Sequence, residues 1–209
     1  MHLNETEFAI LSALAGKVRV LSRDQIVRAW TSKPSDFDHI MHSLARLIAN
    51  KLVTMHVWTV VVPNTNREPI FTWKPKAPDP DSWQISLNAK QRWNQKSNRV
   101  FVYQATAAAG RIFGARTGGL IREIEQQHDL LLGEVYIDYV RYLPELAEHW
   151  IGEDLMPIAA KGVKNPDAFL LDQDLQPRRV IESAGAYSQR QIRTFHQYCV
   201  RRSLPYELW

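Results

Sequence analysis

The first third of the chain contains three helix-like stretches and then changes its periodicity. Apolar residues recur every three or four positions in each stretch, and each stretch follows a residue able to cap a helix: Asn4, Ser22 and Ser35. After Lys51 the period becomes that of strands, first in residues 52–62 and again in residues 70–73, with a Pro- and Asn-containing turn between them. The pattern predicts three short helices followed by a β-hairpin.

That order is typical of a winged helix-turn-helix, in which the third helix enters the major groove of DNA. We therefore assign residues 1–75 to a DNA-binding domain of this type. Serine hydroxyls and arginine suit phosphate and base contacts. The predicted DNA-binding residues are Lys33, Ser35, His39, His42, Ser43 and Arg46 at the third helix, with Arg67 on the hairpin turn. Small winged helices also dock proteins, and this face is not densely basic, so that alternative stays open.

A proline-rich segment, residues 76–84, has no apolar period and predicts a linker between two domains. Residues 76–122 carry 8 Lys and Arg against 2 Asp and Glu, whereas residues 123–209 carry 9 against 14. The excess of positive charge before residue 123 favours contact with a polyanion. A second candidate nucleic-acid surface consists of Arg99, Arg111, Arg116 and Arg122, with Trp93 and Tyr103 interleaved. The alternative is a packing segment with solvated arginines.

The rear of the chain begins with the longest predicted helix, whose apolar stripe runs from Ile121 to Tyr139 and which Pro144 ends. His128 lies on that stripe, as a hydrogen-bonded core histidine or as a catalytic one. Three short extended runs follow, then an amphipathic helix and a last strand, at residues 149–155, 165–173, 177–185, 188–203 and 204–209. The fold class we expect is therefore mixed α/β (α+β).

Two carboxylates occupy suggestive places in these runs. Pro166–Asp167 precedes one apolar run, and Glu182 ends the next. Carboxylate oxygens are the ligands that hard divalent ions such as Mg²⁺ prefer, and a metal-dependent nuclease presents its acids in this way. Such enzymes also need a lysine two residues after the glutamate, where this chain has Ala184. An alanine can neither orient a water nor stabilise developing charge.

The order helix, three strands, helix, strand, with PDAFL and VIESAG, resembles the PD-(D/E)xK nuclease fold. More specifically, residues 100–209, including FHQYC and LPYELW, resemble the replication-relaxation family of plasmids and mobile elements. The resemblance implies a restriction-endonuclease-like domain over residues 85–209. It also implies Asp167 and Glu182 as the metal-binding acids, Glu134 as the helix carboxylate that completes the shell, and Lys164 as a migrated lysine.

The function expected on these grounds is double-stranded DNA binding in plasmid or mobile-element replication, relaxation or mobilisation, with a nuclease-like domain that does not cleave. The resemblance adds a relaxase or replication protein as a partner, and a homodimer is also open. The alternative is a Mg²⁺-dependent endonuclease that uses Asp167, Glu182 and Lys164. If the two acids are relics, they should lie together on adjacent strands, held by Lys164 or by backbone donors.

Composition excludes several classes of protein. The 209 residues are 45% hydrophobic and 23% charged, which is typical of a globular chain. No apolar stretch approaches the roughly 20 residues that span a bilayer, and the polar, acidic start lacks the pattern of a signal peptide. The lone Cys199 excludes an internal disulfide framework and a zinc finger. We expect a cytoplasmic protein without a membrane partner.

Overall fold

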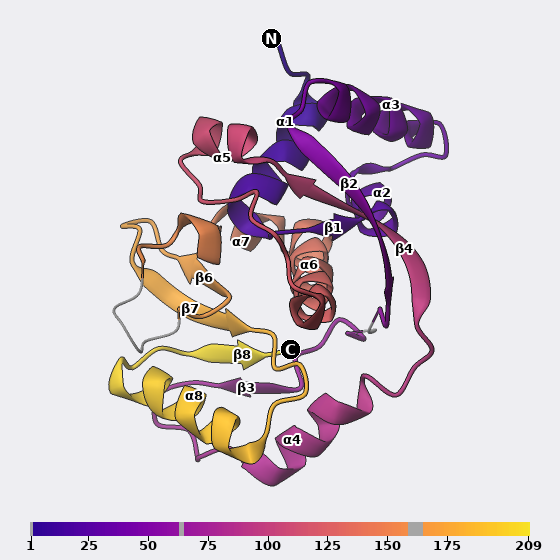
Figure 1. Ribbon diagram of the computed structural model, residues 1–209. Helices are drawn as coiled ribbons and strands as arrows, with labels where there is room; N and C mark the ends of the chain where they lie inside the picture. Colours follow the sequence, from indigo (N-terminus) through magenta and orange to yellow (C-terminus); the bar gives the residue numbers. More distant parts are fainter. Residues whose placement is uncertain (1, 63–64, 159–164) are drawn as a thin grey trace.

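Three helices and a three-stranded antiparallel sheet form the front of the molecule in the computed structural model, which describes residues 2–62, 65–158 and 165–209 (Figure 1). The strand order is β1-β4-β2, with β1 at Leu21–Ser22, β2 at Val53–Val60 and β4 at Asn98–Ala105. The helices are α1 (Glu5–Ser12), extended by a π-helical turn (Ala13–Lys17), then α2 (Arg23–Trp30) and α3 (Asp36–Ala49). Capping boxes begin α1 at Asn4 and α2 at Ser22.

The predicted hairpin between residues 52–62 and 70–73 is wrong. All eight residues of β2 pair with β4, from Val53 opposite Ala105 to Val60 opposite Asn98. The shorter strand β3 (Phe71–Trp73) pairs instead with β8 (Tyr206–Leu208). Strand β2 can form more hydrogen bonds with the eight-residue β4 than with the three-residue β3. The longer connection to β4 costs little, because the entropic cost of closing a loop rises by only about 0.6 kcal/mol for each doubling of its length.

The second sheet has five strands in the order β3-β8-β7-β6-β5. The strands β5 (Trp150–Gly152), β6 (Ala168–Leu171) and β7 (Pro177–Glu182) form an antiparallel meander. Helix α8 (Gln189–Arg201) then returns the chain so that β8 runs parallel to β7. The expected order of helix, three strands, helix and strand is therefore present, and the fold is mixed α/β.

Side chains of the second sheet alternate between two cores. Val180 packs with Ile192 and Cys199 under α8 and α4 (Ser82–Gln91), whereas the neighbouring Ile181 belongs to the large core shared with the front of the molecule. Strand alternation produces this division, since successive side chains point to opposite faces. The sheet thus has α4 and α8 on one face and α6 (Glu123–Tyr142) on the other (Figure 1).

Helix α6 packs between the two sheets. It ends, as predicted, just before Pro144, the first residue of α7 (Pro144–Glu148). One hydrophobic core runs from Leu14 of the front through Leu131 of α6 to Trp150 of β5. Gly133 permits close approach, because a Cβ there would lie 3.0 Å from the carbonyl oxygen of Val20. Short elements complete the chain, namely α5 (Ala107–Phe113) and the 3₁₀ turn Glu153–Leu155.

The two sheets do not divide the chain at the predicted linker, residues 76–84. Strand β3 precedes this segment and belongs to the second sheet, while β4 follows it and belongs to the first. The chain therefore leaves the front after β2, contributes β3 and α4 to the rear, and returns as β4. Within the described ranges, no helix is long and apolar enough to cross a membrane.

Candidate functional site

Asp167 and Glu182 face each other at one end of the second sheet. Asp167 immediately precedes β6 and Glu182 is the last residue of β7, and both are only 2% exposed. The backbone N–H of Asp167 donates to Oε2 of Glu182 at 3.2 Å, and the N–H of Ser183 donates to Oδ2 of Asp167 at 2.8 Å. The expectation that the two acids lie together and are held by backbone donors is confirmed.

His128 of α6 supplies a counter-charge to this pair. Its Nε2 atom lies 3.0 Å from Oδ2 of Asp167, and its Nδ1 atom lies 3.1 Å from Oδ1 of Asp129. Burial alone lowers the pKa of His128, but the charges of and hydrogen bonds to Asp167 and Asp129 outweigh it and hold the pKa well above its ordinary value. A protonated imidazole can donate to both carboxylates at once.

Glu134 does not join the acids, so the prediction that it completes a metal shell is wrong. The guanidinium of Arg28, on α2, donates to both of its carboxylate oxygens, at 2.8 and 2.5 Å. The side-chain amide of Gln25 donates to the same carboxylate at 3.1 Å. Glu134 therefore fastens α6 to the front helices. Six residues separate it from His128, roughly 9 Å along the helix axis.

Sequence reasoning missed Tyr187, whose hydroxyl donates to Oε1 of Glu182 at 2.5 Å. The turn after β7 brings it there, with Gly185 in the left-handed region at φ +50°. The signal available in the sequence was this glycine, which permits a tight turn and returns an aromatic residue toward the strand end. Each carboxylate oxygen of Glu182 thus accepts a hydrogen bond.

In the described part of the chain, the surroundings of the two acids differ from the nuclease pattern. Ala184, in the position of the missing lysine, is fully buried under α8 and donates its N–H to the carbonyl of Trp209 at 2.8 Å. Lys164 lies outside the described residues. Among the described residues, no three His, Cys, Asp or Glu side chains are grouped so as to hold a metal ion. The acids instead bind His128, Tyr187 and backbone N–H groups.

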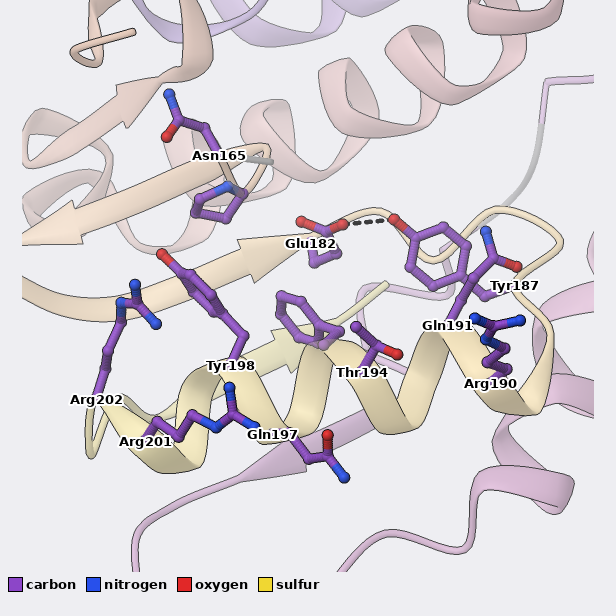
Figure 2. A pocket seen from close by; sticks show the side chains of 12 residues that line it. Asn165, Glu182, Tyr187, Arg190, Gln191, Thr194, Gln197, Tyr198, Arg201 and Arg202 are labelled. Carbon is purple, nitrogen blue, oxygen red and sulfur yellow. Dashed lines mark hydrogen bonds between the residues drawn. The ribbon is translucent and has the colours of Figure 1, made fainter. Parts of the chain in front are cut away.

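A groove of about 660 Å³ opens beside Glu182 along α8 (Figure 2). Helix α8 begins with a capping box at Ser188, and it buries Ile192, His196 and Cys199 against the sheet. Its opposite side lines the groove with three arginines, Arg190, Arg201 and Arg202, and with polar and aromatic side chains between them. Asn165 lies on the facing wall (Figure 2), and Pro166 also lines the groove. Sequence analysis did not single out these arginines, although α8 carries no acid.

The predicted contacts on α3 divide into exposed and buried residues. Lys33, Ser35, His39 and His42 are all exposed, as expected of a helix that meets a ligand. Ser43 is fully buried, so its assignment to the exposed face is wrong. It lies three residues after Ile40 and four before Leu47, and both of these belong to the core.

Arg46 and His39 have partners on α1. The guanidinium of Arg46 lies 3.1 Å from Oε1 of the buried Glu7, while the rest of the Arg46 side chain is partly exposed. Nε2 of His39 lies 3.1 Å from Oγ1 of Thr6. Both residues thus contribute to the packing of α1 against α3.

The remaining predicted contacts are dispersed. Arg67 lies over the ring of Tyr142 at the end of α6, 4.7 Å from its centroid, so its placement on a β2–β3 hairpin turn is wrong. Arg99 is exposed on β4 opposite Thr59, and Arg111 is exposed on α5.

The second candidate surface is also altered. Arg116 donates to the carbonyl oxygens of Glu153 and Met156, Arg122 pairs with Glu125, and Tyr103 is buried. The packing alternative therefore describes Arg116, whose guanidinium is bound to the backbone, and the buried Tyr103. Comparison with protein-family models, with curated proteins and with solved structures finds no match to this chain.

Proposed function

We propose that this protein binds double-stranded DNA through α3 and does not cleave it. The observation that carries the proposal is the arrangement of the front elements. Three helices, a short strand after the first of them, and the hairpin β2–β4 give a sheet of order β1-β4-β2. This arrangement supports a winged helix-turn-helix in which the hairpin is β2–β4 and β3 and α4 are an insertion between its strands.

The surface of α3 supports this use. Lys33 and Ser35 are exposed at its amino end, where helix N–H groups favour anions, and His39 and His42 follow on its outer side. Two acids, Asp36 and Asp38, lie in the first turn of α3, and Asp36 accepts the N–H groups of Ser32 and Lys33, both at 2.8 Å. These hydrogen bonds lower its pKa and tie the carboxylate into the helix start.

The rear domain supports binding without cleavage. Its order of α6, three antiparallel strands, α8 and parallel β8 is the core order of the PD-(D/E)xK fold. Here Asp167 contacts the imidazole of His128, Glu182 accepts a hydrogen bond from the hydroxyl of Tyr187, and Ala184 supplies no charge. The endonuclease alternative therefore has less support. The resemblance to the replication-relaxation family remains a prediction about the process served.

The test is an electrophoretic mobility shift with duplex DNA at several salt concentrations. We expect the double variant Lys33→Glu/His42→Glu to weaken binding at least tenfold and to reduce the slope of log K against log salt by about 1. Lys90→Glu, an exposed charge reversal on α4, is the matched control and should change affinity less than twofold.

Asp167→Asn should leave duplex affinity nearly unchanged, and supercoiled plasmid should stay intact with Mg²⁺ or Mn²⁺. Absence of duplex binding at low salt contradicts the proposal, because phosphate contacts are strongest there. A Mg²⁺-dependent nicking activity that Asp167→Asn abolishes contradicts the second half of it.

A further inference from the structure

The groove along α8 has the size of a ligand site. Its lining on the side of the helix consists of Arg190, Gln191, Thr194, Phe195, Gln197, Tyr198, Arg201 and the C-cap residue Arg202. Its volume of about 660 Å³ lies within the roughly 300–1,000 Å³ typical of small-ligand pockets. Figure 2 shows that Tyr198 and Arg202 point from the helix toward the wall formed by Asn165.

Positive charge is concentrated at the two ends of the groove. Arg190 lies near the amino end of α8, and Arg201 and Arg202 lie at its carboxyl end, roughly 17 Å away along the helix axis. No Asp or Glu occurs between Ser183 and Tyr206. Among the described residues, no carboxylate forms an ion pair with any of these three arginines. Guanidinium groups without acidic partners are suited to phosphate.

The space between the arginines is aromatic and polar. Phe195 and Tyr198 are partly exposed there, and the Arg202 guanidinium lies 4.1 Å from the centroid of the Tyr198 ring. Gln191, Thr194 and Gln197 add hydrogen-bonding groups. Glu182, the acid among the described residues that line the groove, already accepts a hydrogen bond from the hydroxyl of Tyr187. Bases therefore meet aromatic and amide groups in the middle, while phosphates meet arginine at the ends.

We propose that the α8 groove binds a short segment of single-stranded nucleic acid. Its phosphates lie on Arg190 at one end and on Arg201 and Arg202 at the other, and a base stacks on Tyr198. A basic groove with aromatic platforms is the usual design for binding single strands without sequence preference. This site goes beyond the duplex binding proposed for α3 and does not depend on it.

The test is fluorescence anisotropy of labelled dT12 and rU12 with the full-length protein, beside a blunt DNA duplex. Arg190→Ala/Arg201→Ala should weaken binding of the single strands at least tenfold. The slope of log K against log salt should fall by roughly 0.7 for each phosphate that the variant no longer binds. Arg193→Ala is the matched control, because Arg193 is exposed on the same helix but does not line the groove, and it should change affinity less than twofold.

Two substitutions of Tyr198 test the contribution of base stacking separately from that of the arginine charges. Tyr198→Ala should weaken single-strand binding about tenfold, whereas Tyr198→Phe keeps the ring and should bind as the wild type does. The proposal is overturned if the double arginine variant binds single strands as Arg193→Ala does. It is also overturned if AMP competes as well as dT12, since the site then holds a nucleotide and not a strand. Duplex affinity should respond to Lys33→Glu/His42→Glu and not to the groove variants, so each proposal can fail separately.

Discussion

The Nε2 atom of His128 lies 3.0 Å from Oδ2 of Asp167, and this contact joins the first half of α6 to the start of β6, 39 residues later in the chain. The other ring nitrogen contacts Asp129, which is 3% exposed and which Arg19 approaches at 3.6 Å. One histidine thus lies between two buried carboxylates. That arrangement gives Asp167 a structural partner on another element of the fold.

Removal of this imidazole should destabilise the protein. His128→Ala leaves Asp167 and Asp129 without a shared donor, and an unsatisfied buried group costs about 1–3 kcal/mol. We expect the free energy of unfolding in urea to fall by about 2 kcal/mol. His149→Ala, an exposed histidine, is the control and should change it by less than about 0.5 kcal/mol. Equal stability of the two variants would contradict the structural role of His128.

The same histidine should give the stability a characteristic pH dependence. Its pKa in the folded protein is raised well above the ordinary value because Asp167 and Asp129 outweigh its burial. A raised histidine pKa stabilises fully below the unfolded value of roughly 6.5, and this stabilisation is lost as the pH rises through the folded pKa. The difference in unfolding free energy between wild type and His128→Asn should therefore be largest near pH 6 and should shrink toward alkaline pH. A difference that grows with pH would show that the histidine is buried neutral.

A lysine at the position of Ala184 should not create a nuclease. Ala184 is fully buried and packs in the core beneath α8, so Ala184→Lys overfills that core and buries an ammonium group. We expect a loss of at least about 3 kcal/mol in urea unfolding and no cleavage of supercoiled plasmid with Mg²⁺. Ala186→Lys, two residues later and exposed, is the matched control and should fold normally. Mg²⁺-dependent nicking by a folded Ala184→Lys protein would instead show that only the lysine was missing.

Local periodicity was sufficient to predict most elements, because helices and strands are encoded within short windows. Asn4 and Ser22 begin helices, and α6 ends before Pro144, as their local sequences indicate. Pairing between distant strands has no such signal. The partnership of β2 with β4, across a 37-residue excursion from Val61 to Ser97, depends on the fit of two eight-residue strands. The expected β2–β3 hairpin therefore failed, and with it the position of Arg67.

In the candidate site too, contacts between residues distant in the sequence could not be predicted. The proximity of Asp167 and Glu182 follows from antiparallel pairing of neighbouring strands, which the sequence pattern indicates. Their partners come from elements that no local pattern connects to them: His128 from α6 and Tyr187 from the turn before α8. Glu134 carries a carboxylate that could bind a metal, but it lies six positions after His128 on α6 and faces Arg28 instead of Asp167.

The ion pair between Arg28 and Glu134 tests whether that carboxylate is structural. Its two hydrogen bonds raise the pKa of Arg28 and join α2 to α6, with the Glu134 side chain 10% exposed. We expect Glu134→Ala to lower the free energy of unfolding by about 1 kcal/mol, since the guanidinium of Arg28 loses its acceptor but its side chain is 43% exposed and can be hydrated. In a double-mutant cycle with Arg28→Ala the coupling energy should be about 1–2 kcal/mol. Glu123→Ala, at the exposed start of α6, should be neutral. A coupling energy near zero, together with a rise in melting temperature on addition of Mg²⁺ that Glu134→Ala removes, would return Glu134 to the role of a metal ligand.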